Sequence, residues 1–181
     1  MNERKDKKQF SLAYILALCS LMAALGSVIM LSSGVIPILT YASPLVAALT
    51  LIPVQYEFGK KYAWMTWLVT ALLSLMICAD REAAFFYLFL GYYPILKLSL
   101  DKIPVKTARL AAKLTFISTG ICVLFLTLTY ILGLEDMTSE LLLNLSVYIM
   151  LIAIMMIYDK SLDRMMLYYE KRLRNRLIRK V

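Results

Sequence analysis

The residues best suited to bind a ligand in this 181-residue chain are three consecutive charged ones, Asp80, Arg81 and Glu82, between two apolar stretches. A guanidinium group can hold a carboxylate or a phosphate through two parallel hydrogen bonds, so Arg81 is a candidate ligand-binding residue. Arg81 can also pair with one of its neighbouring carboxylates, and an exposed pair of that kind contributes little to stability. Both interpretations stay open at the level of the sequence.

Signatures of catalysis and of metal binding are absent from the sequence. Histidine does not occur, which excludes Ser-His-Asp and Cys-His arrangements. The glycine patterns that hold nucleotide phosphates, GxxxxGK(S/T) and GxGxxG, are also missing. Cys19, Cys78 and Cys122 lie singly in apolar stretches, so neither a zinc site nor a disulfide framework is indicated. The sequence therefore predicts a protein that is not an enzyme and that carries no cofactor and no metal.

Apolar residues dominate the chain, since 61% of its residues are hydrophobic and its mean hydropathy is +0.73. A soluble domain averages about 45–50% apolar residues, whereas helices of about 20 apolar residues can cross a hydrocarbon core about 30 Å thick. The predicted fold is all-α: a polytopic membrane protein with a single six-transmembrane-helix bundle over residues 1–158. Its spans are expected at about 12–31, 38–55, 62–79, 83–99, 110–133 and 141–158.

Lys and Arg residues predict the orientation of this bundle. If the spans alternate in direction, every basic residue except Arg81 lies at the N-terminus, at the second and fourth connections or in the C-terminal tail, all on one side. Basic residues near span ends stay on the cytoplasmic side, so both termini are predicted inside, in a multi-pass protein of a bacterial plasma membrane. Anionic lipid headgroups account for the net charge of +8, and no nucleic acid partner is expected.

Small residues and prolines predict how individual spans are built. Ala13 and Ala17 lie four residues apart on the first span, and such a small-residue face lets another helix approach closely, either inside the bundle or from a partner. Pro53 lies near the end of the second span. Gly91 and Pro94 predict a kink or a break in the fourth.

Ionisable residues inside a membrane span usually mark a pathway for ions or protons. None is expected well inside any of the six spans, so ion-driven transport is disfavoured. The polar groups at depth are uncharged, and they suit either a cavity for a weakly polar molecule or the ordinary roles of interfacial aromatics and helix-bonded hydroxyls. They are Tyr87, Tyr92, Tyr93, Thr127, Thr129, Tyr130, Asn144 and Tyr148.

The segment 159–181 is predicted as a basic amphipathic cytoplasmic helix. Five apolar residues recur in it at helical spacing, with basic residues between them: Leu162, Met166, Tyr169, Leu173 and Leu177. Such a segment lies on an anionic membrane surface, continues the sixth span into the cytoplasm, or docks a partner.

The layout of the chain resembles a known class of transport proteins. Six spans with both ends inside, about 180 residues, Ala13 and Ala17 on the first span and the uncharged outer loop 32–44 resemble the substrate-binding S components of energy-coupling factor (ECF) vitamin transporters. The stretch DREAAFFYLFLGYYPILK, residues 80–97, is also similar to a segment of small uncharacterised membrane proteins of Gram-positive bacteria.

The resemblance implies a function and a set of residues. S components bind a vitamin or a similar micronutrient at the outer end of the bundle, and they dock through the first span onto a membrane coupling protein joined to two ATPase subunits. Transferred to this chain, Ala13 and Ala17 would be the docking residues. The implied ligand site comprises Tyr41, Asp80, Arg81, Glu82 and Asn144.

A second interpretation has no small-molecule ligand. In it the chain is a membrane interaction or scaffold protein of the cell envelope or of the sporulation machinery, with a bundle filled by its own side chains. A partner would then be held through the basic tail.

Overall fold

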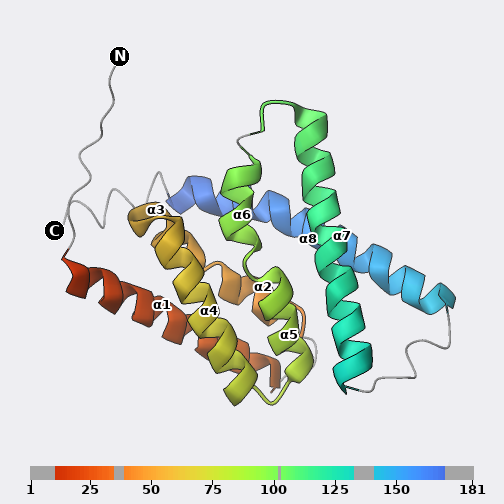
Figure 1. Cartoon of the computed structure of the whole chain (residues 1–181), viewed down its shortest axis with the longest axis horizontal. Helices are drawn as coiled ribbons and strands as arrows, with labels where there is room; N and C mark the ends of the chain where they lie inside the picture. The colour runs from red at the N-terminus through yellow and green to blue at the C-terminus, as the bar shows by residue number, and fades with distance from the viewer. Residues whose placement is uncertain (1–10, 35–38, 102, 133–140, 170–181) are drawn as a thin grey trace.

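The computed structural model describes residues 11–34, 39–101, 103–132 and 141–169, without the side chains of residues 106, 128–132, 141–145 and 147. Over these residues the chain is helical, with no strand (Figure 1). The elements are α1 (Leu12–Leu31), the 3₁₀ turn η1 (Ser32–Gly34), α2 (Ala42–Ala48), α3 (Leu51–Phe58), α4 (Lys60–Ile77), α5 (Arg81–Leu90), α6 (Tyr93–Leu100), α7 (Lys106–Leu132) and α8 (Leu141–Tyr168). The prediction of an all-α protein is confirmed for this part of the chain.

Three segments of the described chain are long and apolar enough to cross a membrane: Leu12–Gly34, Arg81–Leu100 and Thr107–Thr127. Their outward faces carry large apolar side chains, such as Leu21 with 64% of its surface exposed and Leu126 with 53%. Exposed apolar surface of this extent fits contact with lipid rather than with water. The chain is therefore membrane-associated, and the full six-span arrangement remains a prediction.

Two predicted spans are each divided into a pair of shorter helices, and in both a proline accounts for the break. Pro53 has no N–H to donate to Leu49, and the carbonyl of Leu49 instead accepts from Ile52 at 3.1 Å. The second span is thus split into α2 and α3. Pro94 opens α6 in the same way, so the break predicted in the fourth span is confirmed between α5 and α6.

The helix pair α1 and α4 packs through small residues. Gly26 of α1 faces Thr70 of α4 so closely that an added Cβ would lie 3.1 Å from the Thr70 Cγ2 atom. The two helices lie side by side in Figure 1. Ala23 and Gly26 are buried at this contact side of α1, whereas most of α1 is exposed. Close approach of backbones at small residues is the usual way in which helices associate in lipid.

The main apolar core lies where α5 and α6 meet α7 and α8. Phe86, Leu90, Ile121 and Met155 are each almost completely buried there. Helix α8 runs behind α6 and α7 at a large angle to both (Figure 1). It continues without interruption past residue 158, and Leu162 and Met166 join the core, so the predicted tail continues α8 up to Tyr169, and residues 170–181 lie outside the described residues.

Candidate functional site

The turn from Asp80 to Glu82, which we call the outer turn after its predicted side of the membrane, begins helix α5. Asp80 is its N-cap, because the Asp80 carboxylate accepts a hydrogen bond from the Ala83 backbone N–H at 3.2 Å. A side-chain oxygen at this position satisfies a helix N–H that has no partner in the helix. Glu82 lies in the first turn, where a carboxylate also suits the positive end of the helix dipole. The two acidic residues therefore have a local structural role.

Tyr41 is brought to this turn from the N-terminus of α2. Its ring packs edge-on against Phe86, with the ring centroids 5.8 Å apart. The carboxylates of Glu82 and Asp80 lie close enough to act electrostatically on the Tyr41 hydroxyl. Tyr41 therefore lies next to the outer turn, as predicted. Its hydroxyl and the two carboxylates form a partly exposed surface.

The other two predicted ligand residues are Arg81, which follows Asp80 in this turn, and Asn144. Arg81 is exposed, and it forms no ion pair with any residue that the structure describes, so the predicted pairing with Asp80 or Glu82 is absent there. Asn144 belongs to α8, but its side chain lies outside the described residues. A ligand role for either residue stays a prediction.

Ala13 and Ala17 are both exposed on α1. Helix α1 packs inside the bundle through other residues, among them the buried Ala23, Gly26 and Met30. The face that carries Ala13 and Ala17 continues with the exposed Ala24, so a row of small side chains is open along the outside of α1. Of the two interpretations of the small-residue face, contact within the bundle is not made by Ala13 and Ala17 in the part of the chain that the structure describes.

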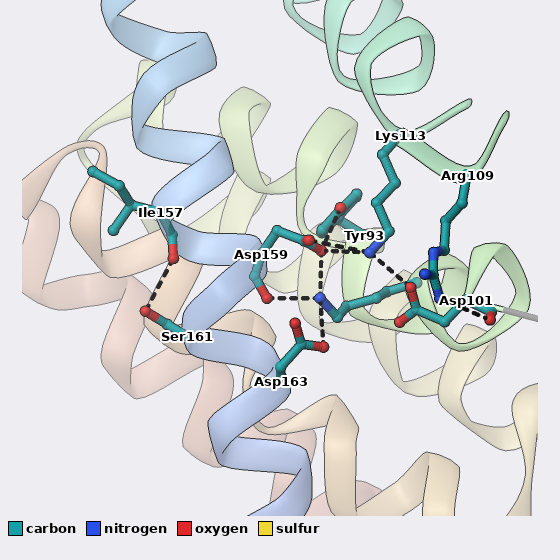
Figure 2. A network of polar contacts seen from close by, with 9 residues as sticks. Tyr93, Asp101, Arg109, Lys113, Ile157, Asp159, Ser161 and Asp163 are labelled. Carbon is teal, nitrogen blue, oxygen red and sulfur yellow. Dashed lines mark hydrogen bonds and ion pairs between the residues drawn. The ribbon is translucent and has the colours of Figure 1, made fainter. Parts of the chain in front are cut away.

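Sequence reasoning missed the most highly connected polar group of the structure, which we call the lysine–aspartate cluster (Figure 2). At its centre the ammonium group of Lys97 on α6 has no exposed surface. Lys97 pairs with the Asp159 carboxylate of α8, donates to the Asp159 carbonyl oxygen at 2.6 Å and contacts the Asp163 carboxylate at 2.9 Å. Asp159 and Asp163 are one helical turn apart and both face Lys97.

A second lysine joins the cluster from α7. Lys113 contacts the Asp159 carboxylate at 3.0 Å and the Asp101 carboxylate at 2.7 Å. Tyr93 donates its hydroxyl hydrogen to Asp159 at 2.7 Å. Figure 2 shows these side chains converging on Asp159. One carboxylate therefore connects α8 to α6 and to α7.

The cluster is balanced in charge, with two lysines against Asp101, Asp159 and Asp163, and Arg109 next to Asp101. The Arg109 guanidinium donates to the Asp101 carbonyl oxygen at 3.5 Å. Burial raises the pKa of Asp159, but the hydrogen bonds from Lys97, Tyr93 and Lys113 outweigh it and leave that pKa below its ordinary value. Asp159 is accordingly an ionised anchor and is poorly suited to carry protons near neutral pH.

The cluster lies near the ends of the candidate spans, with Lys97 three residues before the end of Arg81–Leu100, so it does not contradict the expectation that no ionisable residue lies well inside a span. Lys97 is fully buried within the candidate span Arg81–Leu100, and Lys113 is 9% exposed within Thr107–Thr127. Buried charges in a membrane protein are expected to be paired, and here they are.

A signal for the cluster was present in the sequence. Asp159 and Asp163 are four residues apart, so both lie on one face at the predicted cytoplasmic end of the sixth span. The predicted topology brings Lys97 and Lys113 to the same end of the bundle. Complementary charges at one membrane level would have indicated a contact between these helices.

The uncharged polar groups expected at depth have diverse surroundings. Tyr87 is fully buried, and Tyr93 belongs to the lysine–aspartate cluster. Tyr148 forms a hydrogen bond with Ser118. Thr127 donates to its own helix at Val123 O, 2.8 Å away, which is the ordinary helix-bonded role. The side chains of Thr129 and Tyr130 lie outside the described residues.

Comparison with known proteins gives no relative from which a role could be transferred. No protein-family model, no curated protein and no solved structure matches the chain. The class that the fold itself defines is a helical, membrane-associated protein with an open small-residue face on α1 and a buried ionic cluster between α6, α7 and α8.

Proposed function

We propose that the chain is a substrate-binding membrane subunit, an S component, of an energy-coupling factor transporter in the bacterial plasma membrane. In this proposal six spans place both termini inside, and the substrate is a vitamin or a similar micronutrient. The chain itself is not an enzyme, because ATP hydrolysis is supplied by two partner ATPases through a membrane coupling protein.

The observation that carries the proposal is the exposure of Ala13 and Ala17 on α1. A helix that needed only to contact lipid would gain nothing from small side chains, whereas a helix that docks a partner needs them for close approach. The contact of α1 with its own bundle is already made by other residues, including Ala23, Gly26 and Met30. Ala13 and Ala17 therefore remain available for a helix of a second protein.

The outer turn supplies the substrate-binding part of the proposal. Tyr41, Asp80 and Glu82 lie together at the predicted outer end, and Arg81 is exposed beside them with no ion pair among the described residues. A hydroxyl, two carboxylates and one guanidinium group suit a polar small molecule that carries hydrogen-bond donors. Asn144 of α8 is proposed to complete this site.

The docking proposal is tested by affinity purification of the chain from its own host. The wild-type chain is expected to retain the coupling protein and both ATPases, and the variant Ala13→Leu/Ala17→Leu is expected to lose them by more than about tenfold, equivalent to about 1.4 kcal/mol. The matched control is Ala108→Leu/Ala111→Leu, two exposed alanines of α7 that receive the same substitution.

The outcome separates docking from general damage. Loss of the partners in the α1 variant with retention in the α7 control supports the proposal. Equal retention in both variants, or absence of ATPases from the wild-type preparation, contradicts it. Native mass spectrometry of the same preparation reports a bound micronutrient directly.

A second candidate function is the scaffold protein without a small-molecule ligand. It is favoured by the interior next to the outer turn, where Met30, Ala47 and Tyr87 are each fully buried among the protein's own side chains. A wild-type preparation that retains a different membrane protein and no small molecule would favour this candidate.

A further inference from the structure

Four aromatic side chains follow one another across the surface of three helices, and we call them the aromatic row. Trp64 and Trp67 of α4 lie with their ring centroids 5.3 Å apart, and the ring of Tyr92, the residue before α6, lies 5.4 Å from that of Trp64. Phe116 of α7 lies 5.5 Å from Tyr92. Helix α6 lies between α4 and α7 (Figure 1), so the row runs from α4 past the beginning of α6 to α7.

The aromatic row is open to the outside of the protein. Trp64 has 36% of its surface exposed, and the other three side chains are partly exposed. Tyr92 and Phe116 belong to the candidate spans Arg81–Leu100 and Thr107–Thr127, so this surface faces lipid. Trp and Tyr rings favour the level of the membrane at which the headgroups meet the acyl chains. The row can therefore pack against the upper part of an acyl chain.

A lysine and a hydroxyl group lie together next to this row. Lys60 precedes Trp64 by one turn of α4, so the two side chains share a face and are roughly 6 Å apart along the helix. The Lys60 ammonium group donates a hydrogen bond to the Ser99 hydroxyl of α6. Ser99 follows Tyr92 by seven residues, about two helical turns, and so lies on the same side of α6. The two polar groups thus lie at the predicted cytoplasmic ends of α4 and α6.

The positive charge of Lys60 has no carboxylate partner in the part of the chain that the structure describes. Lys60 is exposed, and no ion pair joins it to a described residue. Glu57 is the nearest carboxylate in the sequence, and it accepts a hydrogen bond from the Tyr169 hydroxyl of α8 at 3.2 Å. Both lysines of the lysine–aspartate cluster, in contrast, are paired. Lys60 can therefore bind an anion from outside the chain.

We propose that this surface binds an anionic phospholipid of the cytoplasmic leaflet. The Lys60 ammonium group and the Ser99 hydroxyl hold the lipid phosphate, and one acyl chain packs along Trp64, Tyr92 and Phe116. An ammonium group has three N–H donors, so the bond to Ser99 leaves two for phosphate oxygens. Basic residues between helices on the cytoplasmic side suit anionic headgroups. This proposal does not depend on the transport function.

The headgroup chemistry predicts which phospholipids are preferred. A choline headgroup carries its own cation beside the phosphate, which opposes the approach of Lys60, whereas a glycerol headgroup carries none. One basic residue near the membrane surface strengthens the binding of an anionic lipid by about fivefold. We therefore expect phosphatidylglycerol to be preferred over phosphatidylcholine by about that factor.

Tryptophan fluorescence tests the proposal, because Trp64 and Trp67 are the two tryptophans of the chain and both belong to the row. The full chain is reconstituted into phosphatidylcholine vesicles that contain increasing mole fractions of dibrominated phosphatidylglycerol or of dibrominated phosphatidylcholine. Bromine on an acyl chain quenches an indole ring that it contacts. In the wild-type chain, half-maximal quenching is expected at an about fivefold lower mole fraction of the brominated phosphatidylglycerol.

Two variants separate the site from the general charge of the protein. Lys60→Gln is expected to abolish the preference, so that the two brominated lipids quench at equal mole fractions. The matched control is Lys160→Gln, which removes the charge of another exposed lysine at the predicted cytoplasmic side, on α8. This control is expected to keep the preference of the wild-type chain.

Three results would overturn the proposal. One is equal quenching of the wild-type chain by the two lipids, and another is a preference that survives in Lys60→Gln or that Lys160→Gln loses to the same extent. The third is the absence of quenching by either lipid, because the row would then be covered by protein, such as a second copy of the chain.

Discussion

The outer turn and the lysine–aspartate cluster use the same kinds of side chain in opposite ways. At the outer turn, Asp80, Arg81 and Glu82 are adjacent in sequence, and each is at least partly exposed. In the cluster, Lys97 and Asp159 come from helices distant in the chain, and Lys97 has no exposed surface. Charges that are neighbours in sequence have a local role at a helix N-terminus, whereas charges brought together by the fold hold helices to one another.

The surroundings of the two regions explain why their charges should contribute differently to the free energy of unfolding. Water screens charges at an exposed turn, so that a pair there contributes about 0–1 kcal/mol. A buried lysine has lost its hydration and depends on its protein partners. Disruption of the cluster should therefore lower the free energy of unfolding far more than disruption of the outer turn.

The largest effect is expected when Lys97 loses both carboxylates that face it. Asp159→Asn/Asp163→Asn leaves the buried ammonium group with no ionic partner on α8, and removal of the partners of a buried charge costs about 3–5 kcal/mol. The free energy of unfolding, measured by denaturant titration in detergent micelles, should fall by about that amount.

The control for this prediction removes the charge on α6 as well. Lys97→Met combined with both substitutions replaces the ammonium group by an apolar chain of similar length, and it should recover most of the lost stability because a neutral core has no unpaired charge. If the triple variant is as unstable as the double variant, the cost arises from packing, and the ionic interpretation of the cluster is wrong.

An effect of intermediate size is expected on acidification. The pKa of Asp159 lies below its ordinary value of 3.8, so its contribution to stability is fully present above that value and is lost as the pH falls through the lowered pKa. The carboxyl carbon signal of Asp159, assigned by comparison with Asp159→Asn, should still show the ionised form at pH 3.8. A titration midpoint at or above 3.8 would contradict the contacts with Lys97 and Lys113.

The same comparison shows what could be predicted from the sequence. Helices, their apolar faces and the break before Pro94 follow from periodicity and from proline chemistry, which act over a few residues. The capping role of Asp80 is equally local. These features were within reach because each is determined by neighbours in the chain.

The pairing of Lys97 with Asp159 depends on contacts between residues 62 positions apart. In the sequence Lys97 is one of many basic residues near span ends, where a lysine can also extend toward the headgroups. Only the orientation of α8 across α6 and α7 shows that it points into the protein. The exposure of Ala13 and Ala17 could not be predicted for the same reason. A small-residue face has the same sequence pattern whether it packs inside a bundle or binds a partner.

The smallest effect is expected at the outer turn, where Asp80→Ala removes the N-cap of α5. Loss of such a cap costs about 1 kcal/mol, so the free energy of unfolding should fall by about that amount in the same detergent titration. Asp80→Asn keeps a side-chain oxygen that can accept the hydrogen bond of the Ala83 N–H, and it should remain within about 0.5 kcal/mol of the wild-type chain.

Arg81→Ala is the matched control for the outer turn, because the side chain is exposed and forms no ion pair among the described residues. Its effect on unfolding should stay within about 0.5 kcal/mol, as for other exposed substitutions. If Arg81→Ala destabilises the chain as much as Asp80→Ala, the guanidinium group has a structural partner and is not free to bind a ligand. If stability is unchanged while retention of a micronutrient is lost, Arg81 binds the ligand. In that case the outer turn recognises a ligand, whereas the lysine–aspartate cluster holds the helices together.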